Sequence, residues 1–518
     1  MAGRERLNGL PVTRRGLLTG AAAGGGLLLA WSLWPRRYEG ALAPNSTEFA
    51  FGAWLTVGED GVVTVAVPQL EMGQGVTTLL PQIVAMEMGA AWAQVAAAPV
   101  PPTGAQANIP LAVKWAPLWS AFPALADEPD SFLADRFARS EAFAATAEGT
   151  TLAAFENDCR AAGAAARAML AMVAADRWDV AWEECEVANG IVTHGERRAR
   201  FGELAADAAR MTPPDPPPLR PQAPMEEVVP GDVPASSAYP RLDLPAKVDG
   251  SFPFAGDIRL SGMVHASIRH GAWGLRELVG FEEEAARDLG LVALVRSKYW
   301  LAAVADSWWK ADRALDVLRP RFAGPGGIES EAVEAALDEG IERGEAQRIR
   351  SLGDPEAMAT PTLTRRYDIA PALHGGLETA SATALYRDGR LQFWIASQAP
   401  SAARRAAAKA LGLSERDVTL YPMGAGGSFD ARLETTHAIE AALIARDLDR
   451  PVQLTWPRGE EFKALPPRTP VAIALSARLD PNTDRQPLAW RAKLTMPATT
   501  REFGARLFED RTVEAAIE

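Results

Sequence analysis

A glutamine between two glycines is the first feature of this chain that could do ligand chemistry: Gln74 lies between Gly73 and Gly75. Its amide both donates and accepts hydrogen bonds. The flanking glycines permit backbone angles closed to other residues and let a ligand approach main-chain N–H groups. β-branched residues at 61–67 predict a preceding strand, and apolar spacing predicts a following helix over 76–89. By itself this loop favours the simpler interpretation, a tight turn whose glutamine faces solvent.

A second glycine-rich loop, residues 424–429, also lies between a predicted strand and a predicted helix. A dinucleotide-binding turn would need glycine at Phe429, and a nucleophile elbow around Ser428 would need glycine at Asp430. Both interpretations therefore fail. What remains is a loop whose amides and one aromatic ring could lie against a flat or bulky ligand. The alternative is a plain turn with Phe429 in the core.

A third polar cluster places His374 four residues before Glu378. This spacing suits an acid/base pair or half of a metal site. Two glycines between them favour a loop, so a hydrogen-bonded structural glutamate is the simpler interpretation.

Composition excludes several classes of function. The 518 residues carry a formal net charge of -13 and a pI near 5.2, which argues against nucleic acid as a partner. Two cysteines and five histidines have no spacing typical of a zinc or iron–sulfur site, so no metal-ligating residue is assigned. Cys159 and Cys185 could form a disulfide or remain buried thiols.

The N-terminus has the pattern of an export signal. Arg14 and Arg15 precede the small and apolar run 17–34, which is typical of the twin-arginine route to the periplasm. Residues 41–43 could be a cleavage site. Arg36 and Arg37 lie before it, which leaves an uncleaved anchor in the inner membrane as an alternative.

These elements suggest several units behind the signal, as expected for this length. Thr150 and Thr151 introduce an alanine-rich helix predicted over 152–176, where they are N-caps by default and anion ligands if a ligand is present. The predicted units are 1–43 (signal or anchor), 49–211 (first unit), 212–238 (proline-rich linker), 239–322 (small α+β module), 323–360 (connector) and 361–518 (third unit). Further strands are expected at 264–268, 292–296, 300–305, 362–368, 382–387, 390–396 and 418–422, and helices at 307–318, 400–411 and 433–447.

Taken together, these motifs resemble the molybdopterin-binding subunit of the xanthine dehydrogenase and aldehyde oxidoreductase family, of the isoquinoline 1-oxidoreductase beta-subunit type. The resemblance extends from the export signal to about Asp480. It rests on residues 71–75, 241–250 with Asp257, Gly262 and Met263, 374–379, Trp394 with 398–400, and the second glycine loop through 432–434. It implies an α+β, multidomain molybdenum hydroxylase large-subunit fold, with a hammerhead domain at 239–322 and the cofactor-binding regions at 49–211 and 361–518.

The resemblance also implies a cofactor and its contacts. The cofactor is a molybdenum–pyranopterin, as molybdopterin cytosine dinucleotide, whose dithiolene holds the metal in place of protein ligands. Gln74 would hydrogen-bond an oxo ligand of molybdenum, and Arg468 would be an active-site arginine that orients a substrate carbonyl. The implied cofactor-binding residues are Gly73, Gln74, Gly75, Thr150, Thr151, Gly426, Gly427, Ser428 and Phe429.

The implied reaction is hydroxylation of an aldehyde or N-heterocycle with water as the oxygen source. Electrons would leave through [2Fe–2S] clusters in a small partner subunit, with a c-type cytochrome as a further candidate partner. Two departures stand out. The second loop has Ser428 and Asp430 where the family has glycines, and the family's catalytic glutamate belongs to a segment not present in these 518 residues. The sequence thus predicts a C-terminally truncated subunit. The alternative is a catalytically incomplete, membrane-anchored relative that serves as an assembly or binding partner.

Overall fold

The computed structural model describes residues 6–7, 10–11, 38–126, 128, 131–221, 239–272, 276–286, 289–482 and 486–508, in two units, 1–39 and 40–518. In the first unit β1 (Arg6–Leu7) pairs antiparallel with β2 (Leu10–Pro11). The predicted signal residues Arg14, Arg15 and 17–34 lie outside the described residues. Among the helices that are described, none is both long and apolar enough to cross a membrane.

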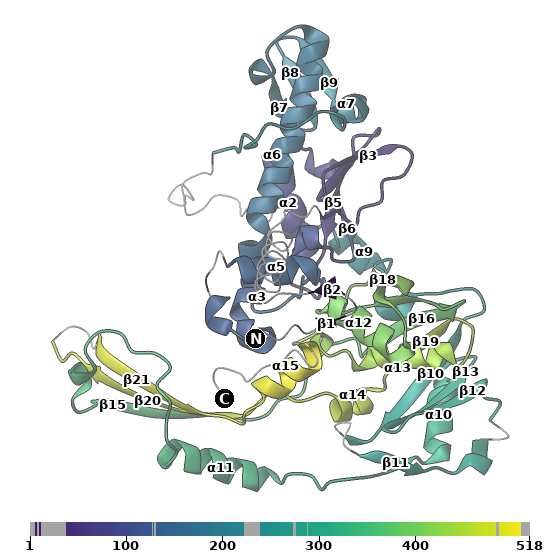
Figure 1. Ribbon diagram of the computed structural model, residues 1–518, viewed down its shortest axis with the longest axis vertical. Coiled ribbons are helices and arrows are strands. Elements are labelled where there is room, and N and C mark those ends of the chain that lie inside the picture. Colours follow the sequence, from purple (N-terminus) through teal and green to yellow (C-terminus); the bar gives the residue numbers. More distant parts are fainter. Residues whose placement is uncertain are drawn as a thin grey trace. The chain divides into compact units, whose positions relative to one another are not determined.

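The first glycine loop follows a strand of a four-stranded sheet, and two helices pack with this sheet (Figure 1). The β-branched strand β5 ends at Val67, and α2 starts at Val76 after the loop. Helix α6 is rich in alanine, and Gly163 lets it approach α2 closely, because a Cβ there would lie 2.8 Å from Val84 O. The elements are β3 (Glu48–Phe51), β4 (Leu55–Gly58), β5 (Val63–Val67), β6 (Val95–Pro99), α2 (Val76–Met88) and α6 (Thr151–Trp178).

Two further groups of elements surround α6. A three-stranded meander with one helix follows it in the chain, and short helices with an aromatic cluster around Trp115 lie near its start. They are β7 (Glu186–Ala188), β8 (Ile191–His194), β9 (Arg197–Arg200), α7 (Phe201–Ala208), α3 (Ile109–Lys114), α4 (Ala116–Trp119), α5 (Phe132–Ser140) and α15 (Thr500–Phe508).

The second glycine loop leaves a seven-stranded mixed sheet with the order β12-β13-β10-β19-β16-β17-β18. Pairs β10–β19 and β17–β18 are parallel and the others are antiparallel. The sheet takes strands from both predicted ranges, 239–322 and 361–518. The strands are β10 (Val264–His270), β12 (Ala293–Arg296), β13 (Trp300–Ala305), β16 (Ser381–Arg387), β17 (Arg390–Ile395), β18 (Val418–Pro422) and β19 (Val452–Thr455).

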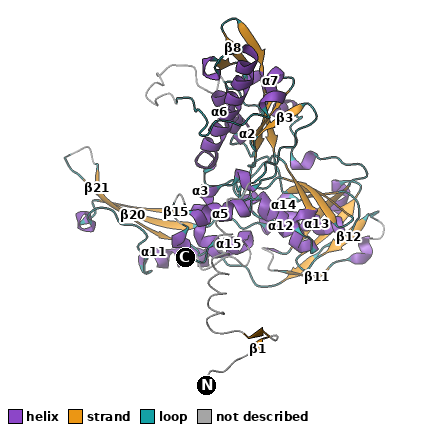
Figure 2. Ribbon diagram, turned by 45° about the horizontal axis from the view of Figure 1, so that its top comes forward, coloured by secondary structure: helices purple, strands orange, loops and turns teal. Residues whose placement is uncertain are grey.

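Helices cover both faces of this sheet (Figure 2). On β13, Ala302 and Val304 face the core formed with α12 and α13, whereas Leu301 and Ala303 face α10. This explains why every residue of β13 is apolar and buried. The helices are α10 (Trp308–Leu318), α12 (Pro400–Leu411), α13 (Thr436–Arg446) and α14 (Arg458–Ala464), with α9 (Leu244–Asp249) before β10.

The remaining elements form smaller layers. β11 and β14 pair as a two-stranded sheet, and β15, β20 and β21 form a three-stranded antiparallel sheet in contact with α11. Their bounds are β11 (Glu277–Gly280), β14 (Arg321–Ala323), α11 (Ser330–Glu342), β15 (Leu363–Ile369), β20 (Val471–Leu479) and β21 (Pro487–Thr495). With separate hydrophobic cores in several layers, the chain has a mixed α/β, multidomain fold, as predicted at that level. Both cysteines are free thiols: Cys159 is buried and Cys185 is half-buried.

Candidate functional site

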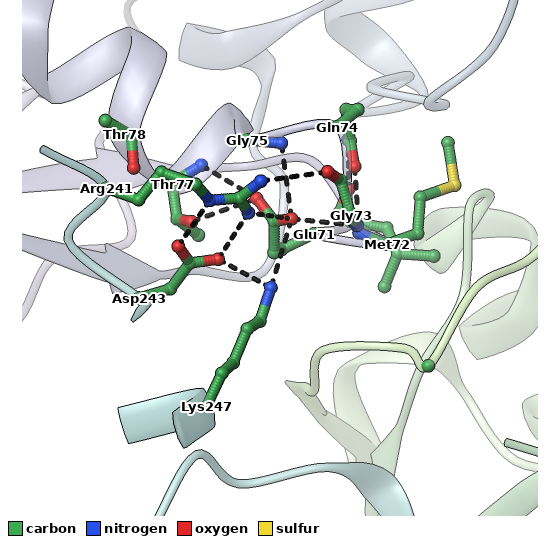
Figure 3. A network of polar contacts seen from close by, with 12 residues as sticks. Glu71, Met72, Gly73, Gln74, Gly75, Thr77, Thr78, Arg241, Asp243 and Lys247 are labelled. Carbon is green, nitrogen blue, oxygen red and sulfur yellow. Dashed lines mark hydrogen bonds and ion pairs between the residues drawn. The ribbon is translucent and has the colours of Figure 1, made fainter. Parts of the chain in front are cut away.

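The carboxylate of Glu71 is the centre of the first glycine loop (Figure 3). Its Oε1 accepts hydrogen bonds from the backbone N–H groups of Gly73 at 2.9 Å and Gly75 at 3.3 Å. Its Oε2 accepts from the N–H of Thr77 at 3.2 Å and from its hydroxyl at 2.9 Å. A buried acidic side chain thus satisfies the amides at the start of α2, a position that favours negative charge.

Two cationic side chains, which share Asp243 as a second partner, bind this carboxylate to a distant part of the chain. Arg241 Nη2 lies 3.1 Å and Lys247 Nζ 3.4 Å from Glu71 Oε1. Asp243 accepts two hydrogen bonds from Arg241, at 2.7 and 2.9 Å, and lies 2.6 Å from Lys247. Arg241 also donates to the carbonyl of Gly73 at 3.0 Å. The segment before α9 therefore fixes the loop's shape.

Both carboxylates in this cluster are held in the charged form. Burial alone would raise the pKa of Glu71, but hydrogen bonds from the N–H groups of Gly73 and Thr77, with the charge of Lys247, lower it below its ordinary value. The hydrogen bond from Arg241 is the main reason that the pKa of Asp243 lies far below its ordinary value. With two cations and two anions, the cluster is neutral and needs no external counter-ion.

Gln74 lies exposed on this loop, and its side chain folds back on it. Oε1 accepts from the N–H of Met72 at 2.8 Å, and Nε2 donates to the carbonyl of Leu70 at 2.7 Å. An amide nitrogen carries two N–H groups, so one donor remains for a ligand. Gly73 and Gly75 have φ angles of 114° and 88°, in the left-handed region predicted to require glycine.

One side of the second glycine loop packs against Glu378. The N–H of Gly426 donates to Glu378 Oε2 at 3.0 Å, and a Cβ at Gly426 would lie only 2.7 Å from the Cβ of Glu378. Glu378 also accepts from the N–H of Gly256 at 3.2 Å, so it is the structural glutamate that the sequence favoured. The Ser428 hydroxyl donates to Gln398 Oε1. These contacts explain the glycine at 426 without a ligand.

The next part of the same loop has unused main-chain donors. Gly427, Phe429 and Asp430 have φ angles of 92°, 53° and 68°. In the part of the chain that is described, no acceptor lies opposite the N–H groups of Gly427, Ser428 and Phe429. Successive amides in such a conformation form a concavity that binds anionic or oxygen-rich groups. Phe429 is 69% exposed, so it is not the core residue of the plain-turn alternative.

The two glycine loops meet directly. The N–H of Ala425 donates to the carbonyl of Glu71 at 2.8 Å. Beneath this contact Leu70, Met423 and Ala425 pack in one small apolar cluster, with Met72 at its edge. The structure therefore brings together the two loops that the sequence singled out, although their residues lie about 350 positions apart.

The segment that leads into α6 is hydrogen-bonded to both loops, through Thr151 to the residues before the first loop and through Thr146 to both. Thr151 donates to Gln69 Oε1 at 2.7 Å, and the buried Thr150 accepts from Asn108 at 2.8 Å. Thr146 accepts from the N–H of Leu70 at 3.0 Å. Its backbone exchanges two hydrogen bonds with Gln398, the residue that also holds Ser428, at 2.8 and 2.7 Å. The hydroxyl groups at the start of α6 thus serve as supports for the loops.

A cavity of about 1800 Å³ brings together a different subset of predicted residues. Phe429 and Arg468 line it, along with His374 and Glu148. The backbone N–H of Arg468 donates to Ala372 O at 2.8 Å, while its exposed guanidinium forms no ion pair with any residue that the structure describes. Gln74 does not line this cavity. The structure therefore places Arg468 and Phe429 together, apart from the first loop.

A buried charged cluster forms another part of the cavity wall. His270 Nε2 lies 2.8 Å from Glu440 Oε1, and its Nδ1 lies 3.4 Å from Glu460 Oε2. Trp456 donates to the second oxygen of Glu440 at 2.9 Å. Burial opposes a charge on the ring, but Glu440 and Glu460 raise the pKa of His270 to about 9. The sequence contained no local signal for this cluster, because its members lie on β10, α13 and α14.

Sequence comparisons match this chain to proteins of known function. Residues 341–495, which include the second glycine loop, match the molybdopterin cofactor-binding domain family. The beta subunit of isoquinoline 1-oxidoreductase from Brevundimonas diminuta is 26% identical over 85% of this chain and 57% of its own length.

Two further relatives show the same partial coverage. A membrane-bound aldehyde dehydrogenase (pyrroloquinoline-quinone) of Gluconacetobacter polyoxogenes is 25% identical over 81% of this chain and 52% of its own. The B subunit of nicotinate dehydrogenase from Pseudomonas putida is 23% identical over 88% and 36%. The chain spans less than two thirds of each relative. Residues 341–495, around the second loop, thus match a molybdopterin cofactor-binding domain, and the chain as a whole is similar to these oxidoreductases.

Proposed function

We propose that this chain is the molybdopterin-binding subunit of an exported oxidoreductase that hydroxylates an aldehyde or N-heterocycle with water as the oxygen source. The observation that carries this proposal is the cofactor-binding domain match over residues 341–495, which contains the loop with unused amides. When bound, a molybdenum–pyranopterin would supply the oxygen-transfer and two-electron chemistry. The relatives include an isoquinoline oxidoreductase and an aldehyde dehydrogenase, which supports the two substrate classes.

The residues present fit such a cofactor at the second loop. The N–H groups of Gly427, Ser428 and Phe429 have no acceptor among the described residues, and a pyranopterin dinucleotide is rich in acceptor oxygens. On the first loop, open space lies around the Cα of Gly73, where a Cβ would meet no atom within 4 Å. The remaining N–H of Gln74 is a further donor. These residues would hold the cofactor, with Gly75 and Gly426 keeping the two loops in shape.

Supporting and substrate-binding roles follow from the same contacts. Thr151 would act through Gln69, which precedes the first loop, and Thr150 through Asn108, which donates to the same Ala145 carbonyl as Gln69. Neither threonine needs to touch the cofactor. Arg468 would orient a substrate carbonyl in the cavity, since its guanidinium has no ion-pair partner in the described structure and a carbonyl oxygen accepts its N–H groups.

The wider assembly is part of the proposal. Two of the relatives are named as the beta and B subunits of their enzymes, which supports partner subunits here. We propose a small [2Fe–2S] partner and a c-type cytochrome for electron transfer. We also propose the cytosine dinucleotide form of the cofactor and export by the twin-arginine route, with or without a retained anchor. Residues 239–322, whose strands join the seven-stranded sheet, would be the hammerhead domain.

Molybdenum and pterin analysis of the complex purified from its source organism tests this proposal. Both should co-purify with the chain. Variant Gly427→Val should lose them, because its backbone would be strained at a φ of 92° and its Cβ would lie only 3.3 Å from the Cα of Gly376, which displaces the loop and its amides. Gly412→Val, also at a positive φ but after α12, is the matched control and should keep them. A folded complex without molybdenum would favour the non-catalytic relative, an alternative supported by the Glu71 carboxylate that already occupies the first loop's amides.

A further inference from the structure

One segment, residues 372–378, connects two parts of the candidate site. At its start, the carbonyl of Ala372 accepts the hydrogen bond from the N–H of Arg468, and these two residues pair as an isolated antiparallel bridge. At its end, the N–H of Glu378 donates to the carbonyl of Gly426 at 3.2 Å, in addition to the bond between the Gly426 N–H and the Glu378 carboxylate. The segment therefore contacts both the second glycine loop and the chain around Arg468.

His374 lies in the middle of this segment, half-buried, with a carbonyl oxygen opposite each ring nitrogen. Its Nδ1 lies 2.5 Å from Phe429 O, and its Nε2 lies 2.9 Å from Pro466 O. A carbonyl oxygen only accepts hydrogen bonds, and a neutral imidazole has one N–H group and one lone pair. A neutral ring would thus point a lone pair at one of the two carbonyls, whereas an imidazolium donates to both.

The two carbonyls belong to parts of the site that must be held in place. Phe429 has a φ of 53°, which is unfavourable for a residue with a Cβ, and its N–H is one of the three without an acceptor among the described residues. Pro466 precedes Arg468 by two residues, and Phe429, Arg468 and His374 line the same cavity. The contact at Phe429 O therefore supports the amide concavity, and the contact at Pro466 O supports the backbone that carries Arg468.

We propose that His374, as an imidazolium, is a positioning residue that fixes the amide concavity of the second loop and Arg468 relative to each other. Loss of one ring proton removes one of the two hydrogen bonds and leaves a lone pair facing a carbonyl, so the loop loosens as the pH rises. The cation also adds positive charge beside a concavity that suits anionic or oxygen-rich groups. Its importance for the cofactor rests on the proposed function, whereas its hold on the loop does not.

The other charged side chains on the contacting segments do not predict this pH dependence. Arginine stays charged between about pH 6 and 8. Burial raises the pKa of Glu378, so its protonation would weaken the bond to Gly426 as the pH falls, which is the opposite direction. Asp430 accepts a hydrogen bond from Gln398 at 3.0 Å. The charged side chains on these segments and in contact with them are Glu378, Asp430, Arg432, Arg458 and Arg468.

Hydrogen exchange of the full chain, measured by mass spectrometry at about pH 6 and about pH 8, tests the proposal. The peptide that covers residues 424–433 reports on the loop, because the N–H groups of Ala425, Ala431 and Leu433 are hydrogen-bonded within the fold. After correction for the intrinsic effect of pH, this peptide should exchange about tenfold faster at the higher pH in wild type, since a charged donor is lost. A peptide from α6 should show no such change.

Two variants distinguish this positioning role from a purely structural one. His374→Leu has no donor and should exchange at the fast rate at both pH values. His374→Arg keeps N–H donors on a planar cation that does not titrate, so it should restore slow exchange and remove the pH dependence. The matched control His194→Leu changes a half-exposed histidine on β8 and should keep the wild-type profile.

A second measurement follows the cofactor in the native complex. Pterin release on dialysis should be about tenfold faster at about pH 8 than at about pH 6 in wild type, and independent of pH in His374→Arg. Equal loop exchange at the two pH values in wild type, or a wild-type pH dependence in His374→Arg, would overturn the proposal. A complex without pterin would count against the proposed function alone, because the exchange measurement needs no cofactor.

Discussion

At the residue scale, Glu71 and Gln74 have separate roles in one loop. Glu71 is buried and bonded to the chain on every side, whereas Gln74 is exposed and keeps one N–H. The sequence identified Gln74 because glycines flank it. It did not identify Glu71 as the anchor, because Arg241 and Lys247 lie more than 160 positions away and ion pairs leave no local pattern.

Replacing Glu71 by glutamine should lower the free energy of unfolding by about 3 kcal/mol at pH 7, because Arg241 and Lys247 lose part of their charge balance in a buried setting. Urea unfolding of the purified chain measures this. Glu59→Gln, an exposed residue, is the control and should cost under about 0.5 kcal/mol. The pKa of Glu71 is lowered in the fold, so the difference from the variant should be present above the ordinary carboxyl pKa and shrink in acid. Equal stability of the two variants would show that Glu71 is not an anchor.

Gln74→Ala should reduce kcat/KM of the reconstituted complex at least tenfold, since it removes the remaining donor toward the cofactor. Gln82→Ala, which removes the same amide from the exposed side of α2, should leave turnover unchanged. Circular dichroism of each variant checks that folding is intact. Unchanged turnover in Gln74→Ala would remove Gln74 from the site.

At the element scale, much of the secondary structure could be predicted, whereas its assembly could not. Helix α12 and strand β13 have the predicted bounds, because proline, glycine and apolar spacing mark them locally. The order of the seven-stranded sheet joins β10 to β19 over about 190 positions, and no periodicity encodes that pairing. The short helices within 100–129 had no recognisable pattern in sequence, because prolines and tryptophans interrupt it.

The His270 cluster joins β10, α13 and α14 and should make stability depend on pH. The folded pKa of about 9 lies above the ordinary 6.5, so proton binding stabilises the fold. This contribution should be complete below pH 6.5 and disappear as the pH rises through 9, a loss on the order of 3 kcal/mol at 1.36 kcal/mol per pKa unit.

Urea unfolding at about pH 6, 7.5 and 9.5 measures the effect, because these values lie below, between and above the ordinary and the folded pKa of His270. The wild-type chain should lose stability across this series, whereas His270→Gln should be less stable and nearly independent of pH. The control His194→Gln changes a half-exposed histidine on β8 and should keep the wild-type profile. A wild-type profile without this decline would contradict a protonated His270.

At the scale of the whole molecule, two loops far apart in sequence form one candidate site, and a separate sheet presents an uncovered apolar face. The family motifs predicted the first, since each loop was recognisable alone. The exposed apolar face of the sheet β15–β20–β21, which includes Tyr367, Trp490 and Leu494, could be recognised only from the strand register. In sequence, these strands alternate in the way of any half-buried strand. The site and the face belong to different layers of the molecule.

The proposed function depends above all on whether this chain binds a molybdenum–pyranopterin cofactor. Its most direct test is elemental and pterin analysis of the native complex, isolated from cells grown with molybdate. We expect molybdenum and pterin in stoichiometric amounts that elute with this chain and are lost in Gly427→Val but not in Gly412→Val. A folded native complex that contains this chain without molybdenum or pterin would contradict it.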